Sequence, residues 1–295
     1  MLTKSTLSRH SPYVGLWITG VILTLNGCLP GPARPAGGNG QPTPQQPAGE
    51  HLTLGNPSGA SIANPDNYLL AKPQFALSFN RSRGIINWVS WHLDRTWRGD
   101  APRTTTFRPD PDLPAGYSTA RNADYAKTGF DKGHLCPSED RDRSPADNAA
   151  TFVLSNVVPQ APNLNRGVWK ALEDYARKRV DEGNEVYIVA GVSGTGGEGE
   201  NGPANSVGES RITVPASFWK LLLILPDGDD DLRRIGPNTE VVAVWMPNQQ
   251  NASGQRWSGY QLSVNDLEQK TGLRFLSTLP ADLQAILKRQ GGGRY

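Results

Sequence analysis

The amino-acid sequence predicts an α+β domain with a largely antiparallel central sheet and flanking helices. Short apolar runs rich in β-branched residues recur along the chain and end near Gly, Pro or Asn, which indicates strands. Segments with helical periodicity lie among them, without the regular strand–helix alternation that a parallel sheet requires. No internal repeat is visible.

The expected elements follow from these patterns in chain order. Strands are expected at residues 87–93, 185–190, 211–214, 218–225 and 240–246. The clearest helix follows Asn165, where Val168 and Leu172 share an apolar face, and Gly183 ends it. A shorter helix is predicted within 144–154, begun by Ser144-Pro145. Two more helices are predicted near the end of the chain, at 264–271 and 280–289.

Residues 1–28 have the layout of a secretory signal. Lys4 and Arg9 precede a largely apolar stretch without charge, residues 11–28. The stretch ends in Leu25-Asn26-Gly27-Cys28, which resembles a bacterial lipobox, in which the cysteine is lipidated. We expect a lipoprotein, exported and anchored at the cell envelope. An uncleaved membrane anchor and an ordinary cleaved signal, giving a periplasmic or secreted protein, are the alternatives.

Residues 29–54 are mostly Pro, Gly, Gln and Ala and predict a flexible tether. The folded domain is expected at 55–290, which suits one domain of ordinary size. Among the four histidines, His92 falls in an expected strand, whereas His10 and His51 fall in segments expected to be unpacked.

The composition limits the metal chemistry. Cys136 is the only cysteine of the expected domain, which excludes an internal disulfide and a Cys- or His-rich zinc site. A metal would therefore need oxygen ligands, which favours Mg²⁺ or Mn²⁺. The net charge of +2 is too small to indicate a partner by itself.

The stretch 129–139 contains Asp131-Lys132-Gly133-His134 and carries the best candidate for acid–base chemistry. An unperturbed imidazole titrates near neutral pH, at about 6.5. The alternative is a turn between a strand and a helix, in which the histidine only caps backbone groups. The stretch 194–199 satisfies the G-x-G-x-x-G pattern, but Glu200 to Pro203 cannot open a helix, so we expect a loop there.

Several separated motifs occur in an order that gives the chain a family resemblance. They are Phe107-Arg108-Pro109-Asp110, Asp131 to Ser138, Ser155-Asn156 with Pro159-Gln160, and Asn165 with Trp169, Leu172 and Glu173. With these motifs the chain resembles the ββα-metal family of sugar-non-specific DNA/RNA endonucleases, most closely its cyanobacterial members, from Asn87 to about Ser277. The resemblance implies a ββα-metal motif in the active site.

The resemblance also implies roles for individual residues. His134 would be the general base that takes a proton from the attacking water. Asn165 would bind one divalent ion directly, and the ion would stabilise the charge that develops at the phosphate and the leaving 3′ oxygen. Glu173 would act on that ion through water. An ion pair between Glu173 and Arg177, one helical turn on, is the alternative.

The remaining implied residues contact phosphate or orient the site. Arg103 would clamp a phosphate, with Arg108 as the competing candidate, and Arg177 would contact phosphate or remain a solvated helix residue. Asn156 would orient groups around the metal. Asp131 and Gly133 would shape the turn that presents His134.

Two positions depart from the expected chemistry. Lys132 stands where the family usually has arginine, so the role of that guanidinium is in question. Cys136 lies two residues after His134 and admits a Cys–His nucleophile as an alternative, which the family role of the histidine disfavours.

The leading hypothesis is therefore a metal-dependent endonuclease that hydrolyses DNA and RNA, single- or double-stranded, to 5′-phosphorylated products. The resemblance implies no obligate protein partner, and the lipid anchor would bring the enzyme to a membrane. A nucleic-acid-binding or adhesion module without activity, and a phosphodiesterase for smaller substrates, are the competing hypotheses.

Overall fold

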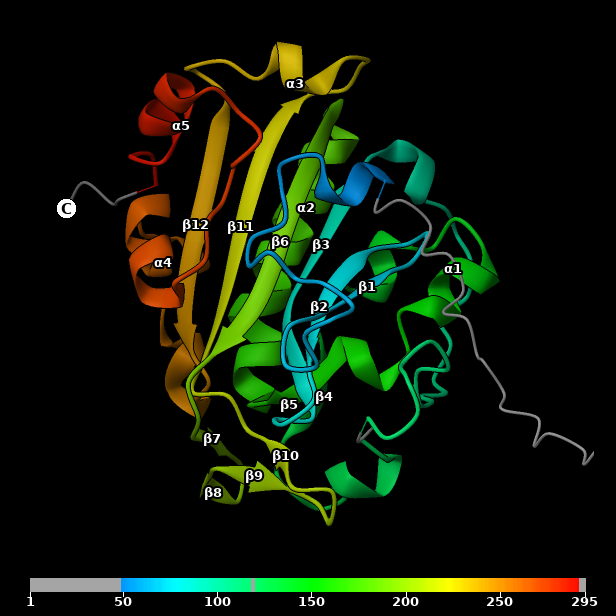
Figure 1. Cartoon of the computed structure of the whole chain (residues 1–295). Coiled ribbons are helices and arrows are strands. Elements are labelled where there is room, and N and C mark those ends of the chain that lie inside the picture. Colours follow the sequence, from blue (N-terminus) through cyan, green and yellow to red (C-terminus); the bar gives the residue numbers. More distant parts are fainter. Residues whose placement is uncertain (1–48, 118–119, 292–295) are drawn as a thin grey trace, which may run out of the picture. The chain divides into compact units, whose positions relative to one another are not determined.

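A six-stranded antiparallel sheet forms the centre of the computed structural model, which describes residues 49–117 and 120–291 (Figure 1). The strand order is β1-β2-β3-β6-β11-β12, and every neighbouring pair is antiparallel. The strands are β1 (Tyr68–Ala71), β2 (Ala76–Asn80), β3 (Ile85–Leu93), β6 (Asn184–Ser193), β11 (Ser217–Pro226) and β12 (Glu240–Pro247). The predicted fold class is confirmed.

Both faces of the sheet are covered, which explains why its middle strands carry apolar residues on both faces. Successive side chains of a strand point to opposite faces. On β11, Leu222 packs in one apolar cluster together with α2 (Lys170–Asp181). Leu221 and Leu223 pack in a second cluster with α4 (Val264–Thr271) and α5 (Ala281–Leu287). The sheet therefore separates two cores.

The helices begin where local sequence signals predict. Helix α1 (Pro145–Ala150) starts at Ser144, whose hydroxyl accepts a hydrogen bond from the Asp147 amide at 3.1 Å. Helix α4 has a capping box between Ser263 and Asp266. The other helical segments are α3 (Asp231–Arg234), η1 (Gly49–Leu52), η2 (Arg95–Trp97), η3 (Asn122–Tyr125), η4 (Ser138–Asp140), η5 (Leu154–Asn156), η6 (Leu164–Trp169), η7 (Gln250–Gly254) and η8 (Trp257–Tyr260).

Two strand regions differ from the prediction, one in the central sheet and one in a separate two-stranded sheet. The hairpin of β1 and β2 is absent from the prediction, because both strands are too short to give a clear period. The predicted strand at 211–214 is reduced to β10 (Ile212–Thr213), since Arg211 has a φ of 49°, in the left-handed region that a strand cannot contain. It pairs with β9 (Ser206–Val207).

The glycine-rich stretch 194–199 leads into a hairpin and not into a helix. Gly194 and Gly196 have positive φ angles, and β7 (Gly197–Gly199) pairs with β8 (Gly202–Ala204). The expectation of a loop without a dinucleotide-binding helix is thus confirmed. Figure 1 shows these small strands beyond one end of the sheet and α3 beyond the other.

Packed structure begins earlier along the chain than predicted, within the last residues of the expected tether. Segment η1 is packed, and His51 is only 3% exposed, with Nε2 hydrogen-bonded to the Pro73 carbonyl oxygen at 2.8 Å. The expectation that His51 is unpacked is therefore wrong, because the ring finds polar partners inside the domain. The expected signal, with His10, and the tether up to residue 48 lie outside the described residues. Among the described residues, no helix has the length and apolarity needed to span a membrane.

Candidate active site

A strand pair followed by a helix carries the candidate site. Strand β4 (Asp131–His134) pairs antiparallel with β5 (Val157–Gln160), so that His134 lies opposite Val157. The chain then enters η6 and continues into α2. The stretch around His134 is thus a strand rather than the turn that the sequence suggested, and the ββα arrangement is present.

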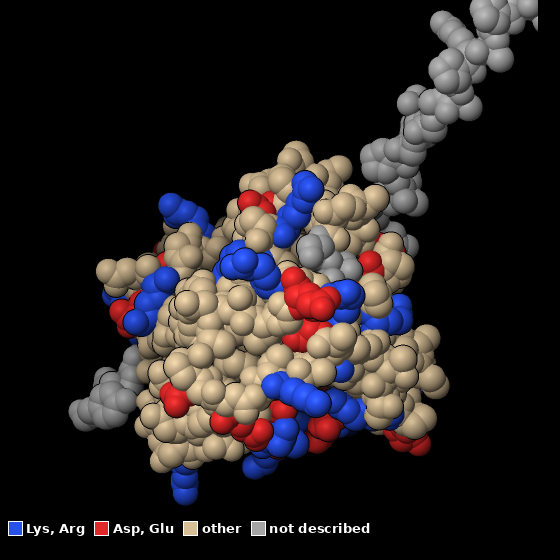
Figure 2. All heavy atoms as spheres, turned by 90° about the horizontal axis from the view of Figure 1, so that it is seen from below, with Lys and Arg blue, Asp and Glu red and all other residues tan. Residues whose placement is uncertain are grey.

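A pocket of about 280 Å³ lies beside this unit and collects most of the predicted residues. Five of its lining residues are basic and two are acidic. The lining residues are Arg103, Lys132, His134, Pro137, Ser138, Glu139, Asn165, Arg166, Lys170, Glu173 and Arg177. Figure 2 shows basic and acidic side chains interspersed over one face of the molecule. Asn156 and Arg108 do not belong to the lining.

His134 is held in the pocket wall by aromatic neighbours. Its ring lies 4.6 Å from that of Phe152, edge to face, and 5.2 Å from that of Phe107, measured between centroids. The residue is 8% exposed, and its Nε2 atom is buried without a hydrogen-bond partner among the residues that the structure describes. Burial disfavours the charged ring and, together with the nearby guanidinium of Arg103, lowers the pKa of His134 to about 3. The imidazole is therefore a neutral base at physiological pH.

The low pKa of His134 can be measured directly. In an NMR titration of the protein without metal or substrate, we expect the His134 ring signals to stay unchanged from about pH 5 to pH 8, because the pKa lies below that window. Spectra of His134→Gln assign the signals. A midpoint near 6.5 would contradict the burial argument.

Asn165 lies in η6, a wide π-type turn with a kink inside it, since Gly167 has non-helical angles. The Asn165 side-chain nitrogen donates to Asp131 Oδ2 at 2.8 Å. Arg166 donates to the same carboxylate. Asp131 thus fixes the amide of Asn165 and leaves its carbonyl oxygen free for a cation. This link was not predicted, because the family resemblance implied for Asp131 only a role in shaping a turn.

Glu173 and Arg177 face the pocket from α2 but have different partners. Glu173 forms an ion pair with Lys220 of β11, at 3.4 Å between Oε1 and Nζ. Arg177 pairs with Glu139 and Asp140, each at 3.0 Å, and with Asp174. The alternative of a Glu173–Arg177 ion pair is therefore wrong. Burial raises the pKa of Glu173, against the opposing charges of Lys220 and Arg177.

The basic residues near His134 resolve the choice between two arginines. Arg103 lines the pocket, donates a hydrogen bond to the Ser138 hydroxyl and lies over the Phe152 ring. Arg108 instead reaches the Ala149 carbonyl oxygen at 3.4 Å, outside the pocket. The geometry thus favours Arg103. Lys132 also faces the pocket, and its ammonium donates to Asn122 at 2.8 Å.

Asn156 and Gly133 support the strand that carries His134. Asn156 is fully buried; its Oδ1 accepts from the Cys136 amide at 3.0 Å, and its Nδ2 donates to the carbonyl oxygens of Cys136 and Thr151. The structure therefore gives Asn156 a role in holding the backbone and not in contacting the metal region. Gly133 is needed because a Cβ there would lie 2.6 Å from the Cβ of Gln160.

Cys136 does not fit the alternative role of nucleophile. It is fully buried, and burial raises the pKa of its thiol, so the thiolate that would attack is disfavoured. Sequence reasoning missed Arg166 and Lys170, which line the pocket, and Lys220, which pairs with the lining residue Glu173. The signal was present, since Lys220 is the only charged residue inside an expected apolar strand at 218–225.

A second group of potential metal ligands lies outside the pocket. Atoms of His92, Glu185 and Asp231 lie within 4.8 Å of one another. However, Arg234 Nη2 bonds to both Glu185 and Asp231, and His92 Nε2 bonds to Glu185 at 2.8 Å. A guanidinium thus already provides the positive charge that a metal would bring. None of these residues lines the pocket of His134.

Cleavage of nucleic acid is a chemistry that this pocket fits, because phosphates need cations and hydrolysis needs a free base. The fold and the pocket define the class of the ββα nucleases. Residues 58–282 match the model of the DNA/RNA non-specific endonuclease family, and the chain belongs to that family.

Individual relatives agree with this assignment. A nuclease of Nostoc sp. is 44% identical over 240 residues, which cover 81% of this chain and 84% of that protein. A nuclease of Serratia marcescens is 28% identical over 251 residues, covering 82% and 86%. Among solved structures, the crystal structure of the EndoG/EndoGI complex has the same fold, with a TM-score of 0.65 at 22% identity over 81% of this chain and 95% of the other.

Proposed function

We propose that the protein is a divalent-metal-dependent endonuclease that hydrolyses DNA and RNA to 5′-phosphorylated products. The observation that carries the proposal is the shared pocket of His134 and Asn165, which brings a neutral base and an amide oxygen to one space. His134 acts as general base and takes a proton from the attacking water. Its imidazole is neutral at the pH of the cell surroundings and so has an unprotonated ring nitrogen, although the lowered pKa makes that nitrogen a weaker base than a free imidazole.

The residues around Asn165 fit a hard divalent ion, Mg²⁺ or Mn²⁺. Asp131 engages the amide nitrogen of Asn165, so the carbonyl oxygen is the atom offered to the ion, and oxygen is the ligand such ions prefer. Glu173 lines the same pocket and acts through water. When bound, the ion supplies a positive charge that stabilises the transition state of phosphodiester cleavage. The protein positions the ion through Asn165 and Glu173.

Arg103 and Arg177 bind the phosphate, and Lys132 adds a third positive charge to the pocket. Guanidinium groups contact phosphate oxygens through two hydrogen bonds, whereas sequence is read from base edges. The pocket lining is dominated by groups that recognise phosphate, which supports action on both DNA and RNA. Lys132 takes the place of the usual arginine as a point charge without the second hydrogen bond.

Digestion of a circular plasmid and of a long RNA tests this function. We expect both to be cut with Mg²⁺ or Mn²⁺, and neither to be cut with excess chelator. The DNA products should be ligatable without prior phosphorylation, because they carry a 5′-phosphate. Binding without cleavage under every metal would instead favour a binding module. Cleavage of a dinucleotide but not of long DNA would favour a phosphodiesterase for small substrates.

We propose further that the protein is exported and held at the cell envelope through a lipid on Cys28. The support is the sequence 1–28 alone. Export also separates a non-specific nuclease from the genome of its own cell. Labelled fatty acid should be incorporated into the wild-type protein and not into Cys28→Ala. A released, unlabelled wild-type protein would favour the cleaved-signal alternative.

A further inference from the structure

Lys220 is a buried cation beneath the proposed active site. It lies on β11 and is 1% exposed. Its ammonium is 4.0 Å from the ring centroid of Trp169 and 5.8 Å from that of Trp91. Its strand neighbours Trp219 and Leu221 are buried as well. A charged group is thus enclosed between the sheet and α2, against two aromatic rings and within electrostatic reach of Asp140 and Arg177 as well as Glu173.

Such a placement needs a reason, because burial of an ammonium is costly unless the charge is paired. The pair with Glu173 compensates the charge, but a buried ion pair is often no more stabilising than apolar side chains of similar size. An apolar side chain would pack in the core at this position, as the residues that follow Lys220 on the strand, 221–225, all do. Stability alone therefore does not account for Lys220.

The partner of Lys220 is a residue of the pocket. Glu173 is 11% exposed and lines the pocket from α2. The two basic neighbours of Glu173 on the same helix face have other partners: Lys170 pairs with Asp174, and Arg177 pairs with Glu139, Asp140 and Asp174. The direct ion pair of Glu173 is therefore with Lys220. The lysine holds one carboxylate oxygen from the sheet side and leaves the carboxylate facing the pocket.

We propose that Lys220 is a positioning residue, which fixes the carboxylate of Glu173 toward the divalent-ion region of the pocket. The inference rests on the proposed function, because it gives Glu173 a role toward the metal. Lys220 itself does not line the pocket, so it contacts neither substrate nor ion and acts only through Glu173. The cation–π contact with Trp169 keeps the ammonium in place.

Direct binding of Mn²⁺ to the protein, measured by calorimetry without substrate, tests the inference. The variants are Lys220→Met, Glu173→Gln and the double variant. Loss of a partner that orients a metal-site residue typically weakens metal affinity by about 10- to 100-fold, and we expect this for Lys220→Met. If Lys220 acts through Glu173, the double variant binds Mn²⁺ as weakly as Glu173→Gln alone, since coupled residues are not additive.

Kinetics on DNA add a second measurement. We expect Lys220→Met to lower kcat with little change of KM, because the phosphate contacts of Arg103 and Arg177 are untouched. Leu222→Ala is the matched control: it lies on the same face of β11, is fully buried and creates a cavity without touching Glu173. It should lower the melting temperature and leave Mn²⁺ affinity unchanged.

The outcomes separate the inference from the proposed function. If Glu173→Gln binds Mn²⁺ like the wild type, the assigned role of Glu173 fails, and the inference fails with it. If Glu173→Gln weakens binding but Lys220→Met does not, or if the two effects add, only the role of Lys220 is overturned. Should Lys220→Met not fold, Lys220→Gln, which retains a hydrogen-bond donor without the charge, replaces it with the same expectation.

Discussion

Replacing His134 with alanine is expected to lower kcat by about 100- to 10,000-fold, the usual contribution of a positioned general base. The reason is that His134 is the only histidine among the described residues that line the pocket, so no other imidazole there can take over its role. KM for DNA should change little, because the phosphate contacts come from Arg103 and Arg177. The measurement is steady-state kinetics on plasmid DNA with saturating Mg²⁺.

A control variant separates lost chemistry from lost structure. Arg108 is exposed and lies outside the pocket, so Arg108→Ala should retain kcat within about a factor of three, as expected for a surface change away from the site. The His134→Ala protein should still bind Mn²⁺ and DNA. A His134→Ala enzyme with more than about a tenth of the wild-type kcat would exclude His134 as the general base.

The fold could be predicted from the sequence where the signals were local. The predicted helix at 264–271 coincides with α4, because a capping box at Ser263 begins it and Gly272, with a φ of 71°, ends it. The hairpin of β1 and β2 could not be predicted in this way. Its stability comes from pairing with β3 and from packing across the sheet, which a short run of residues does not reveal.

In the candidate site, too, the residues within motifs could be predicted, whereas the contacts between distant parts of the chain could not. His134 and Asn165 could be predicted, because both lie in motifs whose order and spacing are specific. The partner of Glu173 could not, because Lys220 is 47 residues away and meets it only when α2 packs on the sheet. The role of Asn156 likewise depends on the backbone of Cys136, 20 residues earlier. Contacts of this kind require the folded chain.

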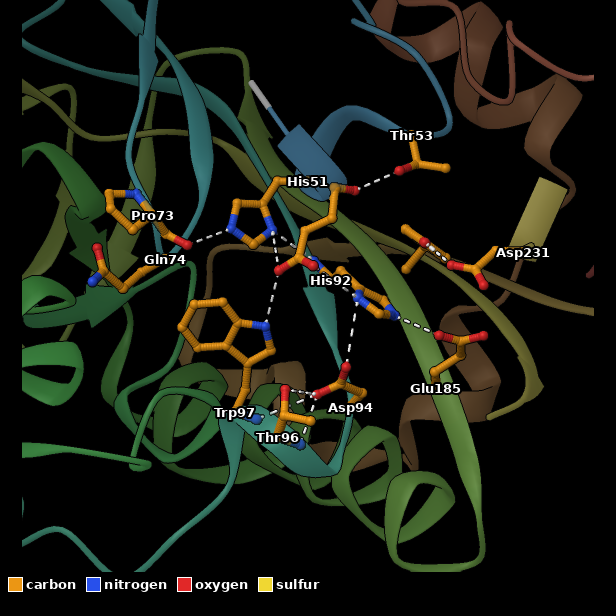
Figure 3. A network of polar contacts seen from close by, with 12 residues as sticks. His51, Thr53, Pro73, Gln74, His92, Asp94, Thr96, Trp97, Glu185 and Asp231 are labelled. Carbon is orange, nitrogen blue, oxygen red and sulfur yellow. Dashed lines mark hydrogen bonds and ion pairs between the residues drawn. The ribbon is translucent and has the colours of Figure 1, made fainter. Parts of the chain in front are cut away.

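A buried ionic network at the far end of β3 is expected to control the pH dependence of stability (Figure 3). His92 is 5% exposed, stacks on the ring of Tyr187 and bonds to Glu185 at 2.8 Å. Burial alone would lower the pKa of His92, but the carboxylates of Glu185 and Glu50 outweigh it and raise the pKa to about 9. His92 is therefore charged in the folded protein at neutral pH.

The direction of the pH effect follows from this shift. The pKa of His92 in the unfolded chain is about 6.5, so the folded state binds the extra proton between that value and about 9. The stabilisation is fully present below about pH 6.5 and is lost as the pH rises through 9, on the order of 3 kcal/mol. Urea unfolding at about pH 6 and pH 9.5 should reveal this loss in the wild type.

Replacing Glu185 with glutamine removes the main partner of His92 and also one partner of Arg234. Breaking a buried ion pair from one side typically costs about 3–5 kcal/mol, so Glu185→Gln should be strongly destabilised at pH 6. The difference in unfolding free energy between the two proteins should narrow by pH 9.5, because the wild type has then lost the His92 charge, whereas the variant, in which only Glu50 and Asp94 still face His92, has less of this stabilisation to lose.

The control for this prediction is Glu240→Gln, since Glu240 is 39% exposed and pairs with Arg179 near the surface. An exposed pair contributes only about 0–1 kcal/mol, so this variant should keep the pH dependence of the wild type. A wild type that is equally stable at both pH values would show that His92 is neutral in the folded state. If Glu185→Gln loses as much unfolding free energy between about pH 6 and pH 9.5 as the wild type, the titrating group lies elsewhere. Removal of the main partner of His92 should reduce a loss that His92 causes.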